Sequence, residues 1–232
     1  MSGRLLVVST PIGNLEDLSP RARRAFEEAD LIACEDTRRT GRLLAHLGIK
    51  KPLLSLHEHN ELRRLPRLLT ALEAGETVAL ASDAGTPLLS DPGFPLVRAA
   101  AAEGIKIEAI PGPSALLAAL VSSGLPPYPF TFVGFPPPKQ GKRRAFYRRF
   151  AALEHTLVVF ESPHRIHASL ADAVAELGDR DAALGRELTK LHEEILRAPL
   201  SEIADRLGAR QTLRGELVLV IAGNRPREES QR

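Results

Sequence analysis

The feature that most constrains this chain is a recurring unit: a short apolar segment, a loop of glycine, proline and small polar residues, and then a helical pattern. The clearest copy is the apolar segment 77–81 followed by the loop 82–93, Ser-Asp-Ala-Gly-Thr-Pro-Leu-Leu-Ser-Asp-Pro-Gly. A brief apolar segment of this kind predicts a buried strand. Asp91 as N-cap and Pro92 at the first helical position predict a helix after it. The unit indicates an α/β sheet, which binds ligands at such strand ends.

Taken alone, the loop 82–93 also fits an ordinary strand-to-helix turn, because glycine, proline and aspartate are turn residues. Further copies of the unit favour a binding site. Strands are predicted in the first half at 5–8, 31–34, 53–56 and 105–110. A helix capped by Ser19 is predicted up to residue 28, and another is predicted to end at Gly48.

Composition sets the class of protein. The 232 residues allow one or two domains, and 44% hydrophobic with 26% charged residues is typical of a soluble globular chain. No apolar run approaches the roughly 20 residues that a membrane span needs. The start of the chain has no long apolar signal region, so a cytoplasmic protein is expected. Cys34 is the single cysteine, which excludes an intrachain disulfide and a cysteine metal cluster.

Charged residues follow the predicted strand 31–34 directly. Glu35 and Asp36 come first, and Arg38 and Arg39 follow. Carboxylates at a helix N-terminus interact favourably with the helix dipole, by about 0.3 to 1 kcal/mol each, and that alone could explain them. Arginines do not suit that end of a helix. Their presence favours a role in binding something anionic.

Two histidine pairs raise the question of a metal. His57 and His59 follow the predicted strand 53–56 as His-Glu-His, but no third histidine or cysteine follows at a ligand spacing. His164 and His167 flank Arg165, which is unfavourable for a cation site. We therefore expect no metal and interpret 57–61 as a polar loop that lines the binding site.

The second half indicates another lobe. Residues 115–122 form an apolar helix pattern that suggests burial at a junction, and proline is frequent from 124 to 138. The elements predicted beyond it are strands at 130–133, 156–160, 182–185 and 216–222, helices at 166–177, 191–196 and 203–207, and a frayed charged tail at 225–232.

A basic stretch precedes the strand 156–160. Six lysines and arginines occur between 139 and 149, with Phe146, Tyr147 and Phe150 among them. Cations interleaved with aromatic residues are the strongest nucleic-acid signal in the chain. The alternative is a solvated helical face whose Phe146 and Phe150 pack on a sheet. The net charge of +2 does not decide between the two.

Five motifs together resemble one known family. They are Thr-Pro-Ile-Gly-Asn-Leu at 10–15, Cys-Glu-Asp-Thr-Arg at 34–38, Ser-Asp-Ala-Gly-Thr-Pro at 82–87, Glu-Ser-Pro-His-Arg at 161–165 and Arg-Glu-Leu-Thr-Lys at 186–190. In this order they resemble the bacterial ribosomal RNA small-subunit methyltransferases I, of the tetrapyrrole-methylase-like superfamily. The resemblance covers nearly the whole chain.

This resemblance implies a fold and an activity. The fold is two α/β lobes, at 1–112 and 113–224, with a mostly parallel sheet in the first, a mixed sheet in the second and a cofactor cleft between them. The activity is 2′-O-methylation of a cytidine in small-subunit (16S) rRNA with S-adenosyl-L-methionine. The expected partners are that rRNA or the assembled small subunit, and a second copy of the chain in a homodimer.

The resemblance also assigns residues to the cofactor. The expected contacts are small residues, hydroxyls and one carboxylate of the motif loops, with Thr189 and Gly215 as weaker choices. They are Pro11, Asp83, Ala84, Gly85, Thr86, Ser114, Ala115, Ser162, Pro163, Thr189 and Gly215. Backbone groups and small hydroxyls suit adenine and ribose, and a carboxylate such as Asp83 suits a ribose hydroxyl or the ammonium group.

A ribose hydroxyl must lose its proton on methylation, so we expect a general base. The candidates at strand ends are Glu35, Asp36, Glu187 and Lys190, the lysine only if burial lowers its pKa. Lys190 and Glu187 rank first because they belong to the second lobe, opposite the cofactor loop. Cations expected to bind RNA phosphates are Arg38, Arg39, Lys139, Lys142, Arg143, Arg144 and Arg165.

Two rival functions stay open at this point. One is an enzyme of the same architecture that methylates a tetrapyrrole or another small molecule, which the basic residues argue against. The other is a non-catalytic RNA-binding or ribosome-assembly module, in which the motif loops would have lost their ligand. S-adenosylmethionine binding separates the second rival from an enzyme.

Overall fold

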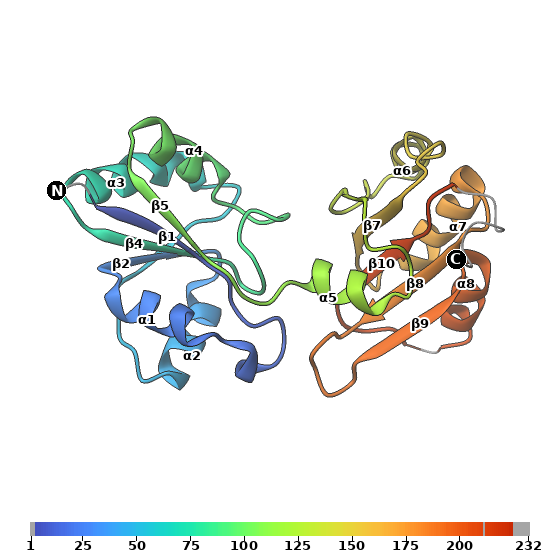
Figure 1. Cartoon of the computed structure of the whole chain (residues 1–232), viewed down its shortest axis with the longest axis horizontal. Coiled ribbons are helices and arrows are strands. Elements are labelled where there is room, and N and C mark those ends of the chain that lie inside the picture. Colours follow the sequence, from blue (N-terminus) through green and yellow to red (C-terminus); the bar gives the residue numbers. More distant parts are fainter. Residues whose placement is uncertain (1–2, 211, 225–232) are drawn as a thin grey trace. The chain divides into compact units, whose positions relative to one another are not determined.

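The computed structural model describes residues 3–210 and 212–224. The chain divides into two compact units, with the boundary between Ser114 and Ala115 (Figure 1). Each unit contains one five-stranded sheet.

The sheet of the first unit is entirely parallel. Its strand order is β3 (Leu53–Ser55), β2 (Leu31–Cys34), β4 (Thr77–Ala81), β1 (Arg4–Val8) and β5 (Lys106–Ile110). Strands β2, β4 and β1 are almost completely buried, as expected for a parallel sheet covered on both faces. Because all five run the same way, the loops that leave their carboxyl ends share one edge of the sheet.

Helices cover both faces of this sheet (Figure 1). They are α1 (Pro20–Glu28), α2 (Thr37–His46), α3 (Glu61–Glu73) and α4 (Phe94–Ala102), with a short 3₁₀ helix η1 (Leu15–Asp17) before α1. Phe26 of α1 and Leu44 of α2 belong to the core on one face. Leu68 of α3 and Leu96 of α4 belong to the core on the other.

The sheet of the second unit is mixed. Its order is β6 (Phe130–Phe132), β7 (Thr156–Glu161), β10 (Leu217–Ile221), β8 (Asp181–Arg186) and β9 (Glu194–Pro199). Strand β6 is parallel to β7, whereas β10 is antiparallel to β7 and β8, and β9 is antiparallel to β8.

Three helices form the main core of the second unit together with its sheet: α6 (Gln140–Arg148), α7 (Ile166–Leu177) and α8 (Leu200–Gly208). Helix α5 (Ala115–Ser122) also contacts β7, β8 and β10. In the sheet, Leu217 lies opposite Glu161 of β7 and Arg186 of β8. Residues 162, 187 and 216 therefore lie together at one edge.

The predicted fold class is confirmed: the first sheet is parallel and the second is mixed. The predicted helix at 191–196 is wrong, because residues 194–199 form strand β9. The predicted N-cap of α4 is also wrong. Gly93 holds that position with a φ of 112°, and Asp91 lies in the loop before it. The predicted tail at 225–232 lies outside the described residues.

No helix among the described residues is long and apolar enough to cross a membrane.

Candidate functional site

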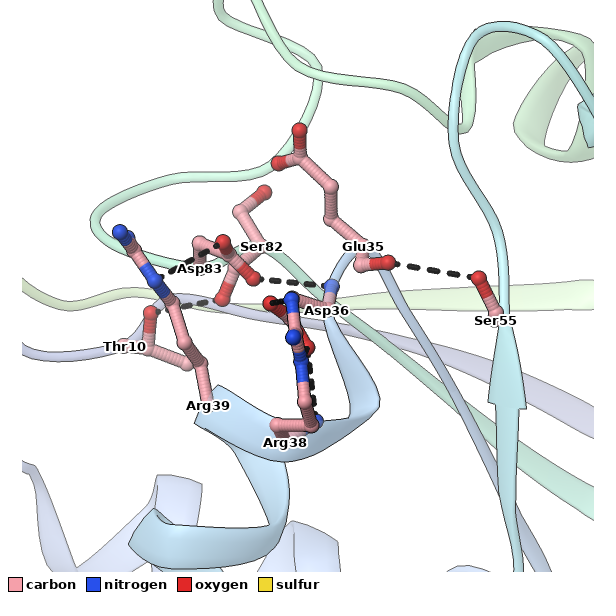
Figure 2. Close-up of polar contacts among 8 residues, drawn as sticks. All are labelled: Thr10, Glu35, Asp36, Arg38, Arg39, Ser55, Ser82 and Asp83. Atoms are coloured by element: carbon pink, nitrogen blue, oxygen red, sulfur yellow. Dashed lines mark hydrogen bonds and ion pairs between the residues drawn. The ribbon is translucent and has the colours of Figure 1, made fainter.

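The loops after β1 and β4 are fastened to each other at the carboxyl edge of the first sheet. The backbone N–H groups of Thr10 and Gly85 each donate to the other residue's carbonyl, at 2.9 and 3.0 Å. The Thr10 hydroxyl donates to the carbonyl of Ser82 at 3.1 Å (Figure 2). These bonds hold two of the predicted motifs in one fixed arrangement.

The loop after β5 joins them through Thr86. Its hydroxyl lies 3.2 Å from the Ser9 hydroxyl and donates to the Pro113 carbonyl at 3.3 Å. A Cβ on Gly112 would lie only 2.9 Å from the Cβ of Ser9, and Gly85 has a φ of 85°. Glycine is required at both positions for these backbones to approach so closely. The result is a cradle of backbone groups and small hydroxyls.

Asp83 connects this cradle to the loop after β2. One carboxylate oxygen accepts from the Asp36 backbone N–H at 3.0 Å, and the other lies 3.5 Å from Nε of Arg39 (Figure 2). Arg38 in turn binds the Asp36 carboxylate with two nitrogens, at 3.0 and 2.7 Å. The hydrogen bonds from Arg38 hold the pKa of the Asp36 carboxyl well below its usual range. Asp36 is therefore an N-cap of α2 and a poor proton acceptor.

Glu35 behaves in the opposite way. Its side chain points away from the Asp36–Arg38 pair (Figure 2). Burial raises the pKa of the Glu35 carboxyl, and the negative charges of Asp83 and Asp91 raise it further. Burial and Asp83 likewise raise the pKa of Asp91. A carboxyl with a raised pKa is a better base than an ordinary one.

Two cavities open at this edge of the first unit. One of about 610 Å³ is lined by Glu35, Asp91, His57 and Phe94, among others. The other, of about 260 Å³, is lined by Pro11, Thr10, Asp83 and Arg39, among others. The sequence analysis did not count Asp91 or Phe94 as site residues. The signal for Asp91 was its place in the same loop as Asp83.

The second unit presents a different charged cluster at its own edge. The Lys190 ammonium lies 2.8 Å from the Glu187 carboxylate and 3.2 Å from the Glu216 carboxylate. The same Glu187 oxygen accepts from the Glu216 backbone N–H at 3.0 Å. A Cβ on Gly215 would overlap the Glu187 carboxyl, so glycine at 215 makes room for this pair.

These contacts shift the pKa values of both preferred base candidates, Lys190 and Glu187. Burial would lower the pKa of Lys190, but the hydrogen bond to Glu187 and the charge of Glu216 outweigh it, and the pKa is raised. The hydrogen bond from Lys190 lowers the pKa of Glu187. The lysine therefore stays protonated and the glutamate becomes a weaker base. The condition placed on Lys190 is not met.

Of the predicted RNA-binding cations on and beside α6, two are paired with carboxylates and two are exposed. Arg143 is buried, with Nε 2.8 Å from an Asp172 oxygen and Nη1 donating to the Pro138 carbonyl at 2.9 Å. Its predicted contact with phosphate is wrong, because α7 supplies a carboxylate that keeps it inside. Arg144 binds Glu176 at 2.6 Å. Lys139 and Lys142 are exposed.

The predicted cofactor residues fall on both units. Six of them follow strands of the first unit: Pro11, Asp83, Ala84, Gly85, Thr86 and Ser114. The others, in the second unit, are Ala115, Ser162, Pro163, Thr189 and Gly215. Thr189 has a φ of 66°, and its hydroxyl oxygen is buried with no hydrogen-bond partner among the described residues. Such an atom can accept a ligand's donor.

No group of three or more histidine, cysteine, aspartate or glutamate side chains in the described part of the chain is arranged to hold a metal ion.

The chain belongs to the tetrapyrrole (corrin/porphyrin) methylase family, whose model matches residues 4–204. Among its relatives are proteins named ribosomal RNA small subunit methyltransferase I. The one from Xylella fastidiosa is 49% identical over 95% of this chain and 82% of its own length. That from Thermotoga maritima is 44% identical over 95% and 99%. The resemblance inferred from the five motifs is confirmed.

Solved structures show the same fold at lower identity. A uroporphyrin-III C-methyl transferase from Thermus thermophilus complexed with S-adenyl homocysteine has a TM-score of 0.67 at 24% identity, covering 96% of this chain and 98% of its own. A diphthine synthase has a TM-score of 0.71 at 17% identity, covering 98% and 93%.

Proposed function

We propose that this protein transfers a methyl group from S-adenosyl-L-methionine to the 2′-oxygen of a cytidine ribose in small-subunit ribosomal RNA. The main observation behind the proposal is the hydrogen-bonded group of loops at Thr10, Gly85, Thr86 and Pro113. The Glu35 carboxyl, whose pKa is raised, belongs to the same edge of the sheet. The relatives named ribosomal RNA small subunit methyltransferase I, about half identical over nearly the whole chain, support the RNA substrate.

The residues present suit this cofactor. S-adenosylmethionine supplies a methyl group on a positively charged sulfur. In the first unit, glycine at positions 85 and 112 lets the loops come close together, with small residues and backbone groups that can bind an adenosine. The Asp83 carboxylate offers an acceptor for a ribose hydroxyl or an ammonium group. The second unit, taken by itself, offers the buried Thr189 hydroxyl oxygen, which has no hydrogen-bond partner within the described part of the chain.

Within this proposal, Glu35 accepts the proton of the ribose hydroxyl. A general base contributes roughly 10² to 10⁴ in rate, most effectively when its pKa lies near the working pH. Glu35 is the candidate carboxyl whose pKa is raised, whereas the pKa values of Asp36 and Glu187 are lowered. Positioning of the hydroxyl supplies a further share of the barrier reduction.

The RNA backbone needs cations at the surface. Lys139 and Lys142 are exposed on and beside α6, and they are the members of the basic stretch that we propose contact phosphates. Arg39 also remains largely exposed beside the cradle, although it faces Asp83. A ribosomal substrate supports a cytoplasmic location, which we propose with it. The homodimer expected from the family resemblance is part of the same proposal, and light scattering of the purified chain tests it.

The proposal is tested by methyl transfer in vitro. Small ribosomal subunits from cells that lack this activity are incubated with radiolabelled S-adenosylmethionine and the purified protein. We expect one label per subunit, in a cytidine whose 3′ linkage resists alkali because its 2′-oxygen is methylated. Label on a base, or label on a uroporphyrinogen and none on the subunit, would contradict the proposal.

A further inference from the structure

A cluster of three phenylalanine rings, packed edge-to-face and tilted, reaches the surface of the second unit. The rings of Phe132 and Phe160 have centroids 4.8 Å apart, and those of Phe160 and Phe135 are 5.5 Å apart. Phe132 and Phe160 are partly buried, whereas Phe135 is 50% exposed. Phe135, the outer ring of this cluster, therefore presents half its surface to solvent.

An arginine covers this outer ring. The guanidinium carbon of Arg165 lies over the Phe135 ring, 5.9 Å from its centroid, within the range of a cation–π contact. The Nε of Arg165 donates to the Ser162 hydroxyl at 3.2 Å and lies 3.9 Å from a Glu161 oxygen. These contacts hold the guanidinium in one orientation against the ring.

Glu161 is the buried carboxylate beside Arg165. Its side chain is 1% exposed, and one of its oxygens accepts from the Ser162 backbone N–H at 3.0 Å. The other oxygen, Oε1, is buried with no hydrogen-bond partner among the described residues. A buried carboxylate without a nearby cation would be strongly destabilising, and Arg165 lies near this one. Glu161 thus draws the Arg165 guanidinium inward and offsets its charge.

We propose that Phe135 and Arg165 form a stacking platform for an unpaired RNA base. Flat aromatic and guanidinium surfaces bind the faces of unstacked bases, and cations beside them bind the phosphates. Lys139 lies four residues beyond Phe135 and is exposed, which supplies such a cation. In this role Arg165 acts through its planar face, not through an ion pair with phosphate as its motif suggested. The inference rests on the RNA substrate proposed above.

The test is equilibrium binding of a short single-stranded RNA that carries one 2-aminopurine, whose fluorescence is quenched when it stacks. We expect quenching with the wild-type protein. Phe135→Leu should abolish the quenching and weaken binding roughly 5- to 100-fold, the range for one base–aromatic stack. RNA with an abasic site in place of the 2-aminopurine should bind the wild-type protein as weakly as the intact RNA binds Phe135→Leu. With this abasic RNA, Phe135→Leu should cause no further loss of affinity.

Matched controls exist in the same unit. Phe130 is 37% exposed and has no ring contact among those found in the described residues, so Phe130→Leu should change binding less than about twofold. Arg149 lies over the Phe150 ring at 5.7 Å. Arg165→Lys keeps the charge but removes the plane, and it should weaken binding, whereas Arg149→Lys should not.

Three results would overturn the platform: no quenching with the wild-type protein, equal losses for Phe135→Leu and Phe130→Leu, or full binding by Arg165→Lys together with loss in Arg165→Gln. The last result would mean a phosphate contact. Circular dichroism and thermal unfolding show whether each variant keeps its fold. Methyl transfer to ribosomal subunits in the same preparations reports separately on the proposed function, so failure of one is distinguishable from failure of the other.

Discussion

The two units place charge at their sheet edges in opposite ways. In the first unit, Glu35 and Asp91 share an edge with Asp83, and the pKa of each of the first two is raised. In the second unit, carboxylates meet cations: Glu187 binds Lys190, and the pKa of Glu187 is lowered. Burial and neighbouring negative charges raise the pKa of a carboxyl, whereas a cation bound to a carboxylate lowers its pKa. The comparison favours the first unit as the source of the proton acceptor in the proposed reaction.

The largest expected effect comes from removing the proposed proton acceptor of the first unit. Glu35→Gln removes the proton acceptor and should lower the rate of methyl transfer by roughly 10² to 10⁴. Glu58→Gln is the matched control, because Glu58 lines the same cavity, its side chain is 80% exposed and its charge has the weakest of the effects on the pKa of Glu35. It should change the rate less than about twofold. Single-turnover kinetics with saturating S-adenosylmethionine measures both, and equal rates for the two variants would remove Glu35 from the mechanism.

The next effect concerns the stability that a paired carboxylate gives to the second unit. Arg143→Leu leaves Asp172 as an uncompensated buried charge, since both side chains are 5% exposed, and should cost about 3 to 5 kcal/mol of unfolding free energy. Arg144→Leu removes a cation that is 46% exposed and should cost below about 1 kcal/mol. Urea unfolding measures both. The double change Arg143→Leu with Asp172→Leu should recover most of the loss, and a double variant as unstable as the single one would contradict a buried pair.

A smaller effect depends on pH. Hydrogen bonds from Arg210 and Arg186 lower the pKa of Glu194 to about 2, below the roughly 4.3 of an unfolded glutamate. A depressed pKa adds stability above the unfolded value, and this stability is lost as pH falls toward 2. Glu194→Gln should therefore cost about 1 to 2 kcal/mol at pH 7, after allowance for solvent screening, and almost nothing near pH 2. A cost that does not change with pH would exclude the ionised pair as its source.

The smallest effect concerns RNA affinity. Lys142→Ala removes one exposed cation from α6 and should weaken RNA binding a few-fold, with the slope of log affinity against log salt reduced by roughly 0.7 to 0.9. Arg144→Ala should change that slope less, because Glu176 already offsets its charge. Filter binding over a salt series measures both slopes. Identical slopes in the two variants and the wild type would mean that α6 is only a solvated face.

Much of the fold was predictable because apolar runs mark the strands and Ser19 and Pro20 mark a helix start; β2, β4, α5 and α7 have the predicted bounds. Strand β9 was not. Residues 191–196, Leu-His-Glu-Glu-Ile-Leu, have helix-forming composition, but pairing with β8 overrides that local preference. Sequence spacing gives no sign of such a partner.

The site was predictable to a similar extent. The motif loops at Thr10 and Gly85 do meet, because parallel strands end at one edge. The pKa of Lys190 could not be predicted, since it depends on Glu216, which is distant in the sequence and is brought near by β10. Arg143 was misassigned for the same reason: its partner Asp172 belongs to α7.

The pH profile of the methyl-transfer rate tests most directly whether the proton acceptor belongs to the first unit. The account predicts a rate that rises to a plateau with a midpoint above the ordinary glutamate pKa. Asp83→Asn should move that midpoint to lower pH, because it removes a charge that raises the pKa of Glu35, and Lys190→Met should leave it in place. A midpoint in the alkaline range of lysine, or one that moves only when Lys190 is replaced, would contradict the account.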